Sequence, residues 1–191
     1  VQATDNSGNV QSSDGTGISS LTFTENAAVP TIGVTAPATS REISLLPLTG
    51  TASDAIPASL SVVQLRVRLL TGISRYADPN SGMAFSLNPV TQSESAWFNV
   101  NSTASPLWTT WSASSASIIY TSGNQYSFEA RALNKAGTYS TTYATATTVT
   151  YDTDPPYTDT LLPIVGSTVS SLPMLSGTSY DTTPTNPGTV S

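Results

Sequence analysis

The sequence predicts an all-β fold, and three features of its composition and patterning point to it. Only 9% of the 191 residues are charged, and Lys135 is the single lysine, so the residues that usually cover exposed helix faces are scarce. Ser and Thr number 30 and 31, and the branched Cβ of Thr favours strands. No long segment has apolar residues at helical spacing, whereas several segments alternate with period two. We therefore expect strands paired into sheets.

Three segments alternate apolar and polar side chains and predict half-buried strands. They span residues 63–69, 126–132 and 147–151. In the first, Arg66 and Arg68 fall on the polar face, where an arginine row could bind an anion but more often pairs with acids or simply keeps an exposed sheet soluble. Further strands are expected at 31–35, 43–52, 95–100 and 116–120.

Turn residues separate these predicted strands. Asp78-Pro79-Asn80-Ser81-Gly82, Ser122-Gly123-Asn124 and Asn134-Lys135-Ala136-Gly137 combine residues that favour tight turns. About seven short strands in some 125 residues are typical of a two-layer β-sandwich. We therefore expect a sandwich.

An internal repeat is the strongest signal in the sequence. Residues 3–10 (ATDNSGNV) and 132–139 (ALNKAGTY) share a pattern 129 positions apart, and residues 48–54 recur at 175–181 with an offset of 127. We therefore expect three successive repeats of about 127 residues. Residues 1–27 would be the last strands of a preceding repeat, 28–154 a complete one, and 155–191 the first strands of a following one.

The repeat boundaries carry prolines, which restrain the backbone at a junction. Pro30 lies at the first boundary and Pro155-Pro156 at the second. Neither end segment can bury its apolar residues alone, because an isolated hairpin is marginally stable in water. We therefore expect neighbouring repeats as partners, supplied by a longer chain or, in a filament, by identical chains through strand addition.

Three of these motifs carry a resemblance to a known family. They are the strand at 126–132 (YSFEARA), the turn at 134–138 (NKAGT) and the junction at 150–156 (TYDTDPP). Together they resemble the bacterial immunoglobulin-like tandem repeats of large extracellular and surface proteins, and the likeness covers nearly the whole chain. The resemblance implies an immunoglobulin-like β-sandwich with an extracellular or cell-surface location.

Composition excludes several kinds of chemistry. Without His or Cys, the chain cannot form a Ser-His-Asp triad, a Cys-His pair, a zinc site of the usual ligands or a disulfide. A net charge of −6 disfavours nucleic acid as a partner, and the apolar runs are too short for a membrane span. We therefore expect no catalytic residues and no enzymatic activity.

Acidic residues near the predicted junctions make calcium the one cofactor that the sequence suggests. Asp54, Asp152 and Asp154 are the candidate ligands, because oxygen-rich junctions can hold Ca²⁺ and stiffen an array. No dense run of alternating Asp is present, and isolated Asp residues commonly form turns. The turn-forming role is therefore the favoured interpretation.

Three tryptophans form the other candidate site. Trp97, Trp108 and Trp111 could form a platform on which a glycan stacks, or they could pack the core, as aromatic residues do in a sandwich without disulfides. Packing is the favoured interpretation. Asn101-Ser102-Thr103 also fits the N-glycosylation acceptor pattern, which often arises by chance.

Three functions are consistent with these features. The first is a structural module of a tandem array that forms a stalk, sheath or fibre. The second is an adhesin or carbohydrate-binding module that uses the tryptophan-bearing segment. The third is a set of accessory repeats in a large secreted enzyme. The motifs define architecture rather than activity, and we expect the structural role.

Overall fold

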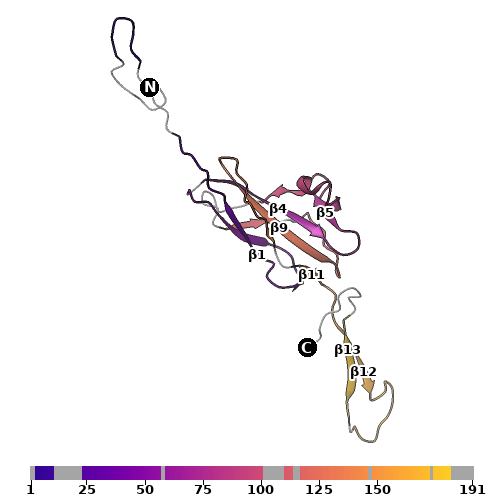
Figure 1. The fold of residues 1–191 in the computed structure, drawn as a ribbon. Coiled ribbons are helices and arrows are strands. Elements are labelled where there is room, and N and C mark those ends of the chain that lie inside the picture. The colour runs from indigo at the N-terminus through magenta and orange to yellow at the C-terminus, as the bar shows by residue number, and fades with distance from the viewer. Residues whose placement is uncertain are drawn as a thin grey trace.

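The computed structural model describes residues 3–10, 23–56, 59–100, 110–113, 117–145, 148–172 and 174–181 (Figure 1). This part of the chain contains strands and one short 3₁₀-helix, and it has no α-helix. The predicted all-β class is confirmed. The elements are β1 (Thr31–Ala36), β2 (Arg41–Glu42), β3 (Leu48–Ser53), β4 (Leu60–Leu69), β5 (Arg75–Asp78), β6 (Ala84–Leu87), η1 (Ser93–Ala96), β7 (Phe98–Asn99), β8 (Trp111–Ala113), β9 (Gln125–Asn134), β10 (Ala144–Thr145), β11 (Val149–Tyr151), β12 (Tyr157–Leu162) and β13 (Ser176–Tyr180).

Two sheets make up the central unit, which we define as the described residues from 28 to 154. The smaller sheet has the order β1-β3-β8, and the larger has the order β2-β11-β9-β4-β5-β6. In the larger sheet, β7 also pairs with β4, and β10 pairs with β9. The long antiparallel ladder between β4 and β9 runs from Leu60↔Asn134 to Leu69↔Tyr126. The arrangement is compatible with a β-sandwich.

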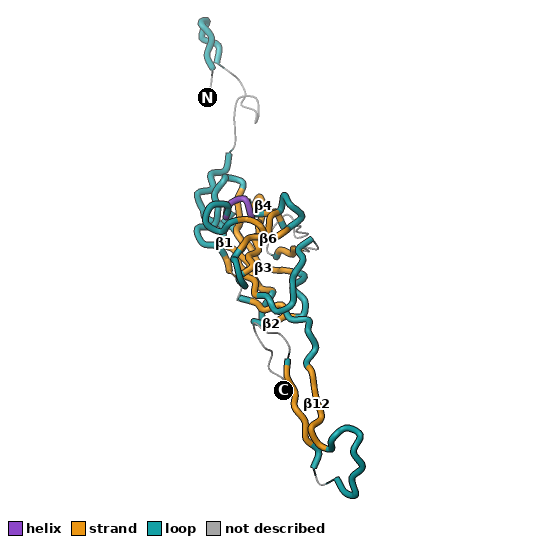
Figure 2. The backbone as a smooth tube through the Cα atoms, turned by 90° about the vertical axis from the view of Figure 1, so that its right-hand side faces the viewer, coloured by secondary structure: helices purple, strands orange, loops and turns teal. Residues whose placement is uncertain are grey.

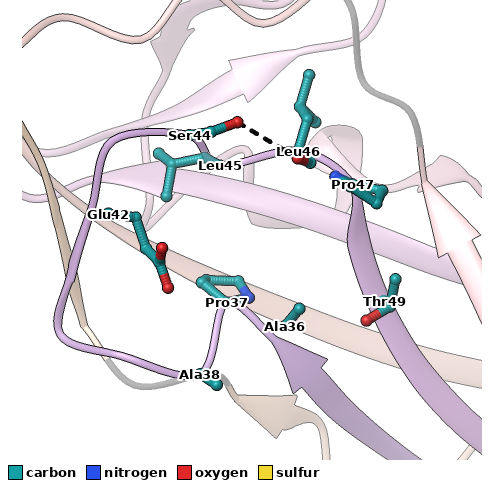
Figure 3. Close-up of a pocket in the computed structure, with 9 residues that line it drawn as sticks. All are labelled: Ala36, Pro37, Ala38, Glu42, Ser44, Leu45, Leu46, Pro47 and Thr49. Atoms are coloured by element: carbon teal, nitrogen blue, oxygen red, sulfur yellow. Dashed lines mark hydrogen bonds between the residues drawn. The ribbon is translucent and has the colours of Figure 1, made fainter. Parts of the chain in front are cut away.

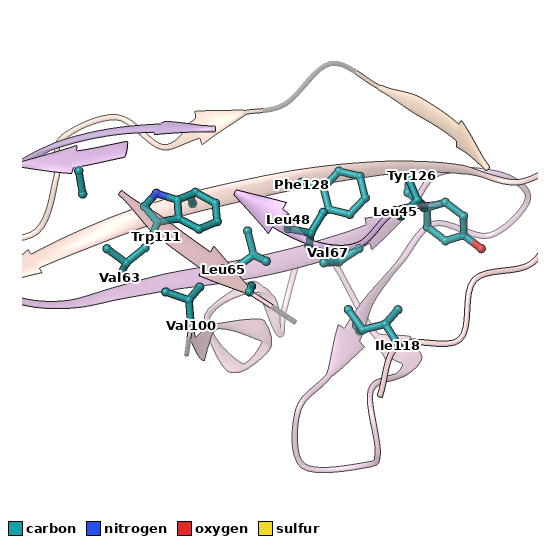
Figure 4. Close-up of a cluster of buried hydrophobic side chains, with 14 of the residues drawn as sticks. Leu45, Leu48, Val63, Leu65, Val67, Val100, Trp111, Ile118, Tyr126 and Phe128 are labelled. Carbon is teal, nitrogen blue, oxygen red and sulfur yellow. The ribbon is translucent and has the colours of Figure 1, made fainter. Parts of the chain in front are cut away.

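The two sheets share one hydrophobic core (Figure 4). Leu65, Val67 and Phe128 come from the β4–β9 ladder, and Leu48 and Trp111 come from the smaller sheet. All five are at most 2% exposed. Alternation along each strand produces this core, because the residues at every second position face the opposite sheet.

Trp111 occupies a space that β3 leaves open at Gly50. A Cβ built on Gly50 would collide with the Trp111 ring and with the carbonyl oxygen of Gly33. The Trp111 indole N–H donates a hydrogen bond to the Thr51 carbonyl oxygen at 3.2 Å. Glycine at position 50 is therefore required by the close approach of both the ring and the neighbouring strand.

Several of the strand predictions are confirmed. The expected strands at 31–35, 63–69 and 126–132 lie within β1, β4 and β9. Residues 149–151 form β11, whereas Thr147 lies outside the described residues. The three predicted turns are also present, because residues 78–82, 122–124 and 134–137 all connect strands.

Three predicted strands need correction. Only residues 48–52 of the 43–52 segment belong to a strand, because Leu46-Pro47 interrupts the extended run before β3. Residues 93–96 form the η1 helix, so the expected strand at 95–100 shrinks to β7. Residues 117–120 are not in a strand, although Ile118 enters the core. The hairpin of β5 and β6 and the short β8 were not predicted.

Two further pieces of chain lie at opposite ends of the central unit (Figures 1 and 2). Residues 3–10 form a tight loop closed by a Thr4↔Val10 bridge. At the other end, β12 and β13 form a two-stranded antiparallel sheet. In the described part of the chain, neither piece adds a strand to the two sheets of the central unit.

We expect Trp111→Ala to lower the free energy of unfolding by about 3–5 kcal/mol, because the substitution opens a large cavity between the sheets. Urea unfolding followed by circular dichroism measures this loss. Ile119→Ala is the matched control, because Ile119 is 82% exposed and its truncation should change stability by less than about 0.5 kcal/mol. Equal effects of the two substitutions would contradict the assigned core.

Candidate functional site

The structure separates the two tryptophans that it describes. Trp111 lies in the core between the sheets, and Trp97 covers the opposite, outer face of the larger sheet, where it contacts Arg66 and Arg131. The two side chains are 2% and 8% exposed. Trp108 lies outside the described residues. The hypothesis of an exposed stacking platform therefore needs correction for Trp97 and Trp111, because both rings are used in packing.

Trp97 is the centre of a cation–π cluster. Its ring lies between two guanidinium groups, with Arg66 Cζ at 4.4 Å and Arg131 Cζ at 4.3 Å from the ring centroid. Arg66 also stacks on Tyr76 at 4.7 Å and on Tyr143 at 5.0 Å. Such contacts strengthen when they are shielded from water, and Arg66 and Arg131 are only 6% and 9% exposed.

Two carboxylates neutralise this cluster. Glu129 Oε2 accepts hydrogen bonds from Arg66 Nε at 2.6 Å and from the Tyr76 hydroxyl at 3.0 Å. Glu94 Oε2 accepts one from Arg131 Nη1 at 2.7 Å. The Arg131 hydrogen bond holds the pKa of Glu94 below its usual value, whereas burial, the main cause, raises the pKa of Tyr76. The arginines are thus satisfied within the protein.

This cluster shows which interpretation of the Arg66 and Arg68 row applies. Arg66 is buried and paired with acids, and Arg68 Nε donates a hydrogen bond to Ser74 Oγ at 2.7 Å. The polar face of β4 is covered by the η1 segment and the loop bearing Tyr143, so it is not the solvated face that alternation alone suggests. Glu94 and Trp97 are three residues apart, but the arginines that they contact are distant in the sequence, so no local signal identified the cluster.

The junction before β1 is held by a network of amide and carboxylate hydrogen bonds. Asn26 Nδ2 donates to Asp54 Oδ2 at 3.2 Å, and Asn26 Oδ1 accepts from the Ala28 amide at 3.1 Å. Asn134 Nδ2 donates to the Ala28 carbonyl oxygen at 3.0 Å. We call these four residues the N-terminal clamp, because they fix the incoming chain to the ends of β3 and β9.

The charge of Asp54 is stabilised in the N-terminal clamp. Burial raises the pKa of Asp54, but hydrogen bonds from Asn134, the Ile56 amide and Asn26 outweigh it, so the net pKa shift is downward. A carboxylate that accepts several hydrogen bonds favours its ionised form. The clamp is therefore strongest when Asp54 is charged.

The other two calcium candidates, Asp152 and Asp154, lie in the junction after β11. Asp152 Oδ1 accepts a hydrogen bond from the Asp154 amide at 3.2 Å, and Asp154 Oδ2 accepts one from Ser122 Oγ at 3.0 Å. Among the described residues, no three carboxylates are grouped closely enough to hold a metal ion, so the structure does not bring Asp54, Asp152 and Asp154 together. In these contacts Asp152 forms a local turn, and Asp154 joins the junction to the turn that contains Ser122.

The backbone repeats its own geometry at the predicted offsets. The bridges Thr4↔Val10 and Leu133↔Tyr139 lie 129 positions apart at both ends (4 to 133, 10 to 139). In the first loop, Asp5 Oδ1 accepts hydrogen bonds from the amides two and four residues ahead. Asn134 Oδ1 accepts the corresponding pair in the second loop. The two loops therefore share one hydrogen-bonding pattern.

The hairpins β1–β3 and β12–β13 also have the same register. Thr31 pairs with Ser53 in the first and Tyr157 with Tyr180 in the second, which are shifts of 126 and 127 positions. Each ladder has one irregularity, which precedes the last pair, Ala36↔Thr49 or Leu162↔Ser176. The match extends to a bulge, which local alternation alone does not specify.

The two hairpins differ in what covers them. Leu48 is fully buried in the core, whereas its counterpart Leu175 is 72% exposed. Leu45 and Leu172 show the same contrast, at 3% and 58%. The β12–β13 hairpin thus presents to solvent the apolar positions that the larger sheet covers in the central unit.

A cavity of about 380 Å³ lies under the loop that joins β1 to β3 (Figure 3). Its lining is mostly small and apolar, with Leu45, Leu46 and two prolines. Its one charged residue, Glu42, accepts a hydrogen bond from Thr39 Oγ1 at 2.8 Å. The lining offers a shallow apolar surface beside the second junction, with no nucleophile–base pair among its side chains.

Comparisons with known proteins found no match for this chain: no family model matches it, and neither do any curated proteins or solved structures. In the described residues, no helix is long and apolar enough to cross a membrane.

We expect Arg66→Lys to lower the free energy of unfolding by about 1–3 kcal/mol, although it preserves charge. A compact ammonium group cannot replace both the guanidinium contacts with three rings and the two hydrogen bonds from Nε and Nη1. Chemical unfolding measures the loss. Arg75→Lys is the matched control: the one hydrogen bond shown for the Arg75 side chain goes to the Ser74 carbonyl oxygen, so a change below about 0.5 kcal/mol is expected. A neutral Arg66→Lys substitution would argue against the cation–π cluster.

We also expect the N-terminal clamp to weaken in acid. Because the pKa of Asp54 is lowered in the folded state, its contribution to stability is present above the unfolded aspartate value of about 4 and is lost as the pH falls through the folded pKa. The free energy of unfolding should be measured from a pH above the unfolded value to a pH below the folded pKa. It should fall less steeply with acidification in Asp54→Asn than in the unsubstituted chain. Parallel curves would show that Asp54 does not carry this dependence.

Proposed function

We propose that this chain is a structural segment of an extracellular tandem array of immunoglobulin-like repeats. One complete unit, residues 28–154, would be flanked by the end of a preceding unit and the start of a following one. Such an array extends a stalk, sheath or fibre by stacking units end to end. Its partners would be neighbouring units of the same kind.

The register shared by the two hairpins is the single observation that carries this proposal. β12 and β13 repeat the pairing of β1 and β3, including the position of the bulge. They also expose Leu172 and Leu175 at positions that are buried in the central unit. A hairpin that retains the core residues of a sandwich but has no core around it is best explained as part of a further unit.

The junctions support a mechanical role. In the N-terminal clamp, Asn26 and Ala28 are tied to the ends of two different strands by Asp54 and Asn134. The second junction contains Pro155-Pro156 and an Asx turn at Asp152. Proline and side-chain hydrogen bonds both reduce the conformations that a linker can adopt. Limited bending between units suits a load-bearing array.

The surface composition supports an extracellular location in this proposal. The outer face of the β1–β3 hairpin carries hydroxyl pairs, with Thr31 Oγ1 at 2.7 Å from Ser53 Oγ and Thr35 Oγ1 at 3.0 Å from Thr49 Oγ1. The chain has one lysine and is rich in Ser and Thr. The glycan-binding alternative has less support, because Trp97 and Trp111 are buried.

An extended chain tests the proposal. When a second set of residues 55–154 replaces residues 182–191, it should complete a further unit on the β12–β13 hairpin. Because the heat of unfolding scales with the folded residues, calorimetry should show it rise roughly twofold. The control chain attaches residues 55–154 directly after residue 154 and therefore lacks the hairpin. Equal unfolding heats for the two chains, or no increase with the hairpin, would contradict the proposal.

A further inference from the structure

Two glycines occupy the same place in the two hairpins. Gly50 pairs with Val34 in the first hairpin, and Gly177 pairs with Thr160 in the second. A Cβ built at either position would collide with a carbonyl oxygen of the neighbouring strand, from Gly33 or Asp159. Both glycines thus mark a point where two strands approach unusually closely, and both leave the inner face of the hairpin open.

In the central unit this opening is filled by a specific strand. β8 adds to β3 in antiparallel register, with Leu48↔Ala113, Thr49↔Ser112 and Gly50↔Trp111. The Trp111 ring then lies on Gly50, and its indole N–H reaches the Thr51 carbonyl oxygen. The opening therefore accepts an aromatic ring that also donates one hydrogen bond, a combination that Trp provides and Phe does not.

The second hairpin has the same glycine and the same neighbouring positions, but the described part of the chain holds no counterpart of β8 beside it. Among the residues that the structure describes, β13 pairs with β12 alone, so one of its edges has no partner strand there. Leu175, Gly177 and Thr178 stand where Leu48, Gly50 and Thr51 stand in the first hairpin, and all three are exposed. An open strand edge beside an apolar face favours the addition of another strand.

We propose that β13 is the acceptor edge for a tryptophan-bearing strand of the Trp-Ser-Ala type. The strand pairs antiparallel with residues 175–177, its indole lies on Gly177, and its indole N–H donates to the Thr178 carbonyl oxygen. This inference rests on the proposed function, because the occupant is the β8 equivalent of the following unit. It goes further by naming the residue that docks and the surface that receives it.

The inner face supports this occupant over a charged or strongly polar one. Thr158, Thr160 and Ser179 surround Gly177 on this face and carry only hydroxyl groups, with Leu162 and Leu175 beyond them. The one charged residue in the β12 and β13 ladder, Asp159, is at the alternate position and faces the other side. The site therefore offers apolar contact and backbone hydrogen bonds, which an extended apolar segment uses.

The test supplies the occupant to the full chain. Residues 110–117 (TWSASSAS) are appended after Ser191 through a flexible Gly–Ser linker of about 15 residues, which keeps the segment at a high effective concentration. We expect solvent exchange of the appended indole N–H and of the Leu175 and Gly177 amides, which face the open edge of β13, to slow by roughly tenfold or more, as measured by NMR. The same tail with its Trp changed to Ala should give no protection.

Two substitutions locate the contact without touching Gly177, whose replacement would disturb the hairpin itself. Ser179→Lys places a charge on the inner face and should abolish the protection. Thr178→Lys is the matched control, because it places the same charge on the outer face, opposite Asp159, and should leave the protection intact.

The possible outcomes separate this inference from the proposed function. Protection by the Ala tail, or equal effects of Ser179→Lys and Thr178→Lys, overturns the indole site but leaves strand addition to β13 in place. Absence of protection with the Trp tail also overturns the inference. Failure of the two-unit chain in calorimetry counts against the tandem array, whatever the result with the tail.

Discussion

The contact between Trp111 and Gly50 is the constraint on which the central unit depends. β3 approaches β1 so closely at Gly50 that no side chain fits there, and the opening is filled by one indole from β8. That ring then meets the aliphatic residues of β4 and β9 and joins the two sheets into one core. Since the chain has no cysteine, this packing is what holds the sheets together, without covalent help.

Two of the few charged side chains of the chain are used inside the fold. Arg66 and Arg131, two of its five arginines, are buried against Trp97 and paired with Glu129 and Glu94. This cluster covers the outer face of the β4–β9 ladder in the way that a third layer would. Sheets with one exposed polar face are common, but here the polar face is itself packed, and planar guanidinium groups make that packing possible.

The packing requirement of the central unit applies to the end segments as well. A hairpin with the register of β1–β3 has apolar residues that need a second sheet, and β12–β13 has that register without the sheet. The N-terminal clamp shows how a neighbouring segment is held, through amide and carboxylate hydrogen bonds at the tips of β3 and β9. The N-terminal clamp and the exposed apolar positions of the β12–β13 hairpin are therefore the features of the end segments that bear on assembly.

The sequence by itself determined the all-β class, the alternating strands β4 and β9, the strand β1, and the turns between strands, because these depend on local pattern and turn chemistry. It also located two pairs of positions with matching local geometry, Asp5 with Asn134 and Gly50 with Gly177. Only the tertiary structure decided where the tryptophans lie: Trp111 faces the core, and Trp97 stacks between Arg66 and Arg131. Burial of an aromatic ring or an arginine depends on partners more than 30 residues away in the chain, and no local pattern encodes those contacts.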